Sequence, residues 1–188
     1  MRRAVVLALC VAWAWASQAL ADQPLLRPSR DVDVTYRAAA PKGGKEVEQR
    51  VRWLAASQTM RIDPPSPDLH VIIDYVARRM SVVRDATRSV VEMAAPDSMT
   101  DIVGGEAATS FTRRGEAAVA GRPCVEWQTL DRQARSALVC ITEDGVLLRV
   151  GTAEQARVSA ISVRYGPQDP AAFRVPADYV RHSPGPAR

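Results

Sequence analysis

Short segments in which apolar and polar residues alternate fill most of the chain between residues 31 and 165. Such alternation over about four to eight residues is typical of a β-strand with one buried and one solvated face. The clearest case covers 46–53, where Val47, Val51 and Trp53 share one face and charged residues occupy the other. Turn signals, such as the Asp-Gly pair at 144–145, separate the segments. The pattern predicts an antiparallel sheet of about ten short strands.

Two strand segments depart from simple alternation. In 69–75 the second face also carries Ile72, so we expect this strand to be covered on both sides. In 157–165 the apolar positions change phase between Ala160 and Ile161, which predicts a β-bulge that lets the strand bend.

The period of the pattern changes after Pro96. Ser98 to Asp101 matches a capping box, the signature of a helix start. The glycines at 104–105 weaken a helix here, each by up to about 1 kcal/mol relative to alanine. We expect one helix from about Ser98 to Arg113, intact or interrupted at the glycines. Its apolar stripe recurs at helical spacing and consists of Met99, Ile102, Val103, Ala107 and Phe111.

These elements predict an α+β fold that is mainly β. Because one helix cannot cover a flat sheet of about ten strands, we expect a strongly curved antiparallel sheet, a half-barrel, with the helix packed in its concave face. Part of the concave wall would then stay open as a cavity for an apolar ligand. The predicted ligand-binding residues are Trp53, Tyr75, Met99, Val103 and Trp127.

The large side chains also allow a second interpretation, which the sequence leaves open. Aromatic side chains dominate the interiors of many domains, so these residues could simply fill one tight core. The residues concerned are Trp53, Tyr75, Met80, Phe111 and Trp127.

Residues 1–21 have the pattern of a secretory signal peptide. A basic start precedes an apolar run over 4–16, and Ala19-Leu20-Ala21 forms a small-x-small cleavage site. The apolar run is too short for a stable helix across a hydrocarbon layer about 30 Å thick, so we favour cleavage near Ala21 over an uncleaved anchor. We expect a periplasmic or secreted protein with no stable membrane span after cleavage. Its parts would be a flexible lead-in (22–30), a single domain (31–181) and a tail (182–188).

Two cysteines remain once Cys10 leaves with the predicted leader, namely Cys124 and Cys140. An even number of cysteines in an oxidising compartment favours a disulfide. Both are equally far along the chain from Arg132, as directly opposed residues of an antiparallel hairpin would be. A redox-active pair is the alternative, but the Cys-x-x-Cys spacing that lowers a thiol pKa is missing.

Charge and residue types argue against several functions. The net charge of +4 falls to about +2 when Arg2 and Arg3 leave with the leader, and no basic stripe suggests a nucleic-acid partner. The chain has two histidines and no recognisable catalytic motif. Asp31 and Asp33 would both face outward without supporting metal ligands. We expect no enzymatic activity, no cofactor, no metal and a monomer.

Several short segments resemble the periplasmic lipoprotein-carrier (LolA/LolB-like) superfamily, whose members share a curved antiparallel sheet wrapped around helices. The segments are the meander over 69–93, Gly121-Arg122-Pro123-Cys124, the stretch from Cys140 to Gly145, and the closing segment from Asp169 to Pro176. The resemblance implies a lipid or lipoprotein ligand. The chain departs from the carriers after Trp53, where Leu54-Ala55-Ala56-Ser57 replaces their Pro-Gly turn. Without that turn, no residue of this chain is assigned to the ligand-gating arginine of the carriers.

Two functions follow as hypotheses. In the first, an exported binding protein shelters an acyl chain or a lipidated protein segment in the concave sheet. In the second, a cell-envelope interaction domain has a filled core and binds its partner at a sheet edge or at the rim. A cavity of roughly several hundred Å³ lined by apolar side chains would favour the first.

Overall fold

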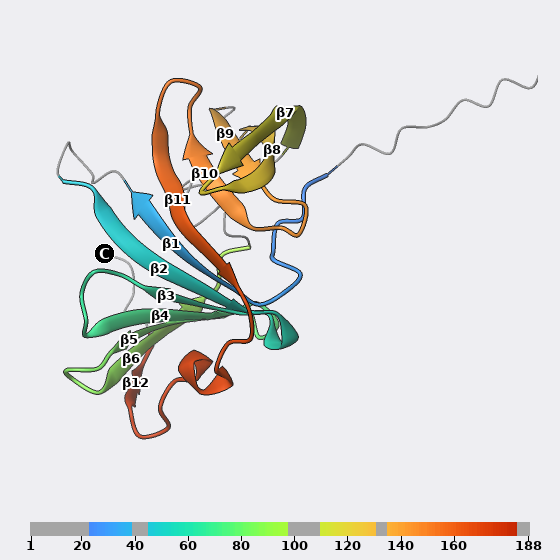
Figure 1. Cartoon of the computed structure of the whole chain (residues 1–188). Coiled ribbons are helices and arrows are strands. Elements are labelled where there is room, and N and C mark those ends of the chain that lie inside the picture. The colour runs from blue at the N-terminus through green and yellow to red at the C-terminus, as the bar shows by residue number, and fades with distance from the viewer. Residues whose placement is uncertain (1–22, 39–44, 98–109, 131–134, 184–188) are drawn as a thin grey trace, which may run out of the picture.

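A computed structural model describes residues 23–38, 45–97, 110–130 and 135–183. Its strands form one open, strongly twisted sheet (Figure 1) in the order β12-β6-β5-β4-β3-β2-β1-β11-β10-β9-β8-β7. Neighbouring strands are antiparallel, except that β12 pairs parallel with β6. The strands are β1 (Val32–Ala38), β2 (Val47–Leu54), β3 (Thr59–Asp63), β4 (Leu69–Asp74), β5 (Arg79–Arg84), β6 (Ser89–Ala94), β7 (Ser110–Val119), β8 (Arg122–Leu130), β9 (Ser136–Ile141), β10 (Leu147–Gly151), β11 (Ala156–Tyr165) and β12 (Val180–His182).

The predicted α+β class, with a helix in the concave face, is wrong. The described residues contain no α-helix, only two single-turn 3-10 segments, η2 (Ala55–Ser57) and η3 (Pro170–Phe173). Residues 98–109 of the expected helix lie outside the described residues, whereas residues 110–113 begin β7. There Phe111 pairs with Thr129 and Arg113 pairs with Trp127. Pairing with β8 gives the backbone N–H and C=O groups of this segment their hydrogen-bond partners. The segment therefore forms a strand, although Phe111 continues the helical spacing of apolar residues.

The core lies on one face of the sheet, where cross-strand pairs continue from strand to strand. Val32 of β1 stands opposite Trp53 of β2, Trp53 opposite Met60 of β3, and Met60 opposite Ile73 of β4. All four are buried, and each such side chain contributes about 1.5–3 kcal/mol by leaving water. The predicted alternation of β2 is confirmed from Val51 to Trp53, where Arg52 points to the opposite, convex face and ion-pairs with Asp63. At the other end of the strand Val47, which was predicted to share the buried face, is 39% exposed.

The predicted bulge in the strand over 157–165 is confirmed. Thr35 of β1 pairs with Ser162 of β11, but the next residue, Tyr36, pairs with Ala160. Ile161 is therefore the extra residue. The bend lets apolar residues on both sides of the bulge, Ala160 and Val163, face the same core.

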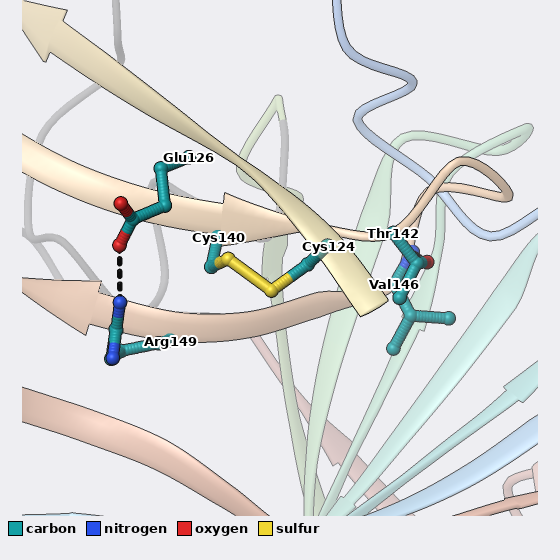
Figure 2. The surroundings of a disulfide bond; sticks show 6 residues. All are labelled: Cys124, Glu126, Cys140, Thr142, Val146 and Arg149. Atoms are coloured by element: carbon teal, nitrogen blue, oxygen red, sulfur yellow. Dashed lines mark hydrogen bonds and ion pairs between the residues drawn. A yellow bond between two sulfur atoms is a disulfide. The ribbon is translucent and has the colours of Figure 1, made fainter. Parts of the chain in front are cut away.

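A disulfide joins Cys124 of β8 to Cys140 of β9, with Cα atoms 5.5 Å apart (Figure 2). The bond was predicted, but the direct opposition of the two residues was not correct. Cys140 stands opposite Glu126, so Cys124 is its diagonal neighbour. Glu126 reaches over β9 to an ion pair with Arg149 of β10, and this pair lies beside the disulfide in Figure 2.

The C-terminal segment covers the convex face of β3–β6, and we call residues 170–182 the C-terminal strap. Phe173 is buried, and Val175 and Tyr179 pack against a small cluster of Ile72, Val83 and Val90. Arg61 of β3 also donates to the carbonyl of Ala172 at 2.8 Å. The expectation that the strand over 69–75 is covered on both sides is therefore met at Ile72.

Residues 23–30, the predicted lead-in, run along the rim of the sheet. Pro28 is buried, and the N–H of Ser29 donates to the carbonyl of Asp144 at 2.9 Å. The guanidinium carbon of Arg27 lies 4.5 Å from the ring centroid of Tyr75. Within the described ranges, no helix has the length and apolarity needed to cross a membrane.

Candidate functional site

The predicted ligand-binding residues that the structure describes lie in the packed core. Trp53, Tyr75 and Trp127 are 2%, 6% and 4% exposed. The rings of Trp53 and Tyr75 contact each other, with centroids 5.7 Å apart. Met99 and Val103 lie outside the described residues. At the three described positions the side chains are buried in the core, and their part in ligand binding stays a prediction.

A partly open stretch of the core face lies farther along the sheet, on β4–β6. Val71, Val82 and Val91 stand in one cross-strand row, and Met80 and Met93 in the next. All five side chains are only half-buried. We call these five residues the apolar strip; the sequence analysis did not single it out as a ligand-binding surface.

A cleft of about 680 Å³ opens at the rim of the sheet, and we call it the rim cleft. It lies where four parts of the chain meet: the segment before β1, the β7–β8 hairpin, the β9–β10 turn and the end of β11. The fold thus brings together residues more than a hundred positions apart. The lining residues are Ser29, Arg30, Glu116, Ala117, Arg122, Pro123, Cys124, Val125, Thr142, Glu143, Asp144 and Tyr165.

Asp144 organises one wall of the rim cleft. Its carboxylate accepts hydrogen bonds from Arg30 Nε at 2.7 Å, Thr142 Oγ1 at 2.5 Å and Tyr165 Oη at 3.0 Å. Burial alone would raise the pKa of Asp144, but the bonds from Thr142, Arg30 and Tyr165 outweigh it and lower the pKa. Asp144 is therefore ionised and holds three neighbouring side chains in place.

Tyr165 also gives the cleft an aromatic surface that two cations contact. The guanidinium carbon of Arg30 lies 3.8 Å from the ring centroid, and that of Arg122 lies 5.3 Å from it. Both distances are within the range of cation–π attraction. Burial and the hydrogen bond to Asp144 raise the pKa of Tyr165, so the ring keeps its hydroxyl proton at neutral pH.

Arg122 is exposed, as Arg30 is, but unlike Arg30 it has no ion-pair partner within the described ranges. Its one polar contact is a long hydrogen bond of 3.4 Å to the carbonyl of Val163. The backbone fixes its position. The preceding turn places Ala120 and Gly121 at φ angles of 49° and 70°, and the disulfide begins two residues later at Cys124.

The polar residues that the sequence analysis considered have structural partners. Asp31 accepts from the backbone N–H groups of Ala55 and Gln168. Burial alone would raise the pKa of Asp33, but ion pairs with Arg50 and Arg164 lower it. In the part of the chain that is described, no group of His, Cys, Asp and Glu residues could hold a metal ion.

Sequence reasoning missed the residues that form the rim cleft. Arg122 was noted only within Gly121-Arg122-Pro123-Cys124, and Tyr165 only as a strand residue. The one local sign of a binding site was the position of Arg122, a cation between a turn and a cysteine of the disulfide. Its closeness to Arg30 and Tyr165 depends on the strand order, which local sequence patterns do not encode.

Comparison with known proteins shows a shared fold but no family. No protein-family profile and no curated protein sequence matches the chain. The crystal structure of an uncharacterized conserved protein from Thermus thermophilus is similar, with a TM-score of 0.58, 12% identity, and coverage of 83% of this chain and 91% of that one. The chain therefore shares the fold of that protein.

Two more remote structures are also similar. The complex of MucA and MucB from Pseudomonas aeruginosa gives a TM-score of 0.49 at 15% identity, covering 76% of this chain and 54% of that one. A LolA superfamily protein from Nitrosomonas europaea gives 0.37 at 9% identity, covering 79% and 92%. Both TM-scores are below 0.5 and both identities are below 25%. Membership of that superfamily stays a prediction.

Proposed function

We propose that this chain is an exported, non-enzymatic binding protein that recognises a segment of another cell-envelope protein in the rim cleft. One observation carries the proposal. Trp53, Tyr75 and Trp127 fill the core, whereas a cleft of about 680 Å³ with aromatic, charged and polar walls opens at the rim. That volume is within the range of about 300–1,000 Å³ typical of binding sites.

The disulfide supports the proposed location. A bond between Cys124 and Cys140 fits an oxidising compartment. The leader-like pattern of residues 1–21 agrees with export. A periplasmic or secreted location is part of the proposal.

The chemistry of the rim cleft supports binding over catalysis. The Thr142 hydroxyl donates to Asp144 and accepts from the N–H of Val146 at 2.8 Å, and because the pKa of Asp144 is lowered, this carboxylate is a weak base. Cys124 is held in the disulfide. His70 lies on another face, beside Asp85. Among the described residues of this cleft, the base nearest the Thr142 hydroxyl is therefore a poorly basic carboxylate, and no histidine lines the cleft.

Site-specific crosslinking tests the proposal. A photoreactive amino acid replaces the exposed rim residue Glu143, and a matched variant carries it at the exposed Arg84 of β5. We expect a discrete polypeptide adduct in the living cell from position 143 and none from position 84. Equal adducts from both positions, or no polypeptide adduct from position 143, would contradict the proposal.

One observation favours a second candidate function, lipid binding at a different place. The apolar strip on β4–β6 is half-buried and could contact an acyl chain. If it does, an environment-sensitive fatty-acid probe will gain fluorescence with the wild-type protein and lose that gain in Val82→Asp. No gain with the wild-type protein would remove this candidate.

A further inference from the structure

We infer that Arg122 binds the free C-terminal carboxylate of an extended partner polypeptide whose last residues occupy the rim cleft. The inference rests on the proposed function and adds the chemical group that is recognised. It begins with the charges of the two cleft arginines. Arg30 is neutralised by its ion pair with Asp144 at 2.7 Å, whereas no described carboxylate lies within ion-pair distance of Arg122.

Arg122 is also held in position before any ligand arrives. The hairpin turn precedes it, the disulfide follows it, and its guanidinium contacts the ring of Tyr165. A planar guanidinium presents its donors in a fork that matches the two oxygens of a carboxylate. Because this fork is pre-positioned, little conformational freedom is lost when a carboxylate binds.

The charges around Arg122 favour a ligand group that carries a single negative charge. Glu116 and Glu143 line the same cleft. Glu116 pairs with Arg113 at 2.9 Å, while no described cation lies within ion-pair distance of Glu143. A phosphate dianion or a run of acidic residues would be repelled by these carboxylates, because like charges raise the energy of binding. The free guanidinium of Arg122 can pair with one carboxylate, and the unpaired Glu143 adds a repulsion that grows with each further negative charge on the ligand.

The shape and lining of the cleft favour a polypeptide over a small acid or a fatty acid. The volume of about 680 Å³ is far larger than one carboxyl group. Ala117, Pro123 and Val125 can contact an apolar side chain, while Ser29 and the Glu143 carboxylate can pair with peptide groups. A polymethylene chain would leave those polar groups without partners, at a cost in affinity.

Peptides with matched C-termini test the inference. The probe is the labelled peptide Ala-Ala-Ala-Ala-Leu, prepared with a free carboxylate and as the C-terminal amide. Binding is followed by the fluorescence anisotropy of the labelled peptide, which serves every variant, and in the wild type also through the side-chain Nε signal of Arg122 in nitrogen-15 NMR of the mature chain. We expect saturable shifts with the free acid and affinity about tenfold or more weaker with the amide, since hydrogen bonds to charged groups contribute about 1.5–3 kcal/mol.

Variants distinguish the carboxylate contact from general effects. Arg122→Gln should lose about tenfold or more in affinity for the free acid, whereas Arg84→Gln, on the exposed surface of β5, should match the wild type. Equal binding of acid and amide, unchanged binding by Arg122→Gln, or no saturable shift would overturn the inference. Tighter binding of decanoate than of the peptide would overturn the choice of a polypeptide.

The crosslinking experiment separates this inference from the proposed function. If the Arg122→Gln variant still forms the polypeptide adduct with the photoreactive residue at position 143, the inferred carboxylate contact is wrong, while the proposed partner site stands. If the wild type itself gives no adduct there, the proposed function fails.

Discussion

Two buried polar side chains, Tyr36 and His70, find their partners in other strands or turns of the chain. The hydroxyl of Tyr36 donates to the carbonyl of Leu147 at 2.5 Å, between residues 111 positions apart. Burial raises the pKa of Tyr36 well above its usual range, so the hydroxyl remains a donor. Alternation along the sequence predicts that Tyr36 faces inward, but its partner, which lies on β10, follows only from the strand order β1-β11-β10.

His70 shows the same rule with a consequence for stability. It is buried on the convex face, and its Nδ1 lies 3.1 Å from Asp85, which also accepts from Tyr179 at 2.9 Å. Burial, and then the positive charge of Arg61, lower the pKa of His70, although Asp85 and Asp63 act in the opposite direction. The folded state therefore keeps His70 neutral where the unfolded chain already takes up a proton.

The pH dependence of stability tests this assignment. Because the folded pKa lies below the unfolded value of about 6.5, the free energy of unfolding should fall as pH drops below about 6.5. Urea unfolding at pH 6.5, 6 and 5 should show this fall in the wild type, a weaker fall in His70→Gln, and an unchanged fall in the exposed control His182→Gln. Identical slopes for wild type and His70→Gln would contradict it.

At the scale of elements, the strands and turns were largely predictable, whereas the strand character of residues 110–113 was not. The inward and outward faces of β2, the bulge in β11 and the disulfide between β8 and β9 follow from local patterns. The helix expected over 98–113 ends in a segment, 110–113, that is strand. Only pairing with β8 decides this, so helical spacing in a short apolar stretch was a poor guide.

The disulfide should contribute substantially to stability. The bonded residues are separated by 16 positions, and closing a loop of this size contributes about 3 kcal/mol in the chain-entropy model. We expect the double variant Cys124→Ser/Cys140→Ser to lose about 2–5 kcal/mol in urea unfolding. Strong reductant should destabilise the wild type and leave the double variant unchanged; a wild type unaffected by reductant would be inconsistent with the bond.

The C-terminal strap should depend on one buried side chain. Phe173, near the start of the strap, is buried, while Val180 of β12 is 60% exposed. Phe173→Ala should cost about 3 kcal/mol and speed amide hydrogen exchange at Val180, whose N–H donates to the carbonyl of Arg88 at 2.9 Å. Val180→Ala should cost less than about 0.5 kcal/mol. Equal effects of the two substitutions would show that Phe173 does not anchor the strap.

At the scale of the whole molecule, long-range assembly determines what the sequence could not reveal. The strand order places β11 beside β1, and the strap returns to β6. Neither pairing has a local signal, because both join segments about ninety or more positions apart. The rim cleft depends on the same assembly, which explains why Trp53 and Trp127 were predicted as ligand-binding residues while Arg122 and Tyr165 were not.

Native mass spectrometry of the mature protein, released from its host envelope without detergent, tests the account most directly. We predict that the chain carries its disulfide and is found bare or bound to a polypeptide, and that Arg122→Gln reduces the bound fraction. A phospholipid or fatty-acid adduct on most wild-type molecules, unaffected by Arg122→Gln, would contradict it.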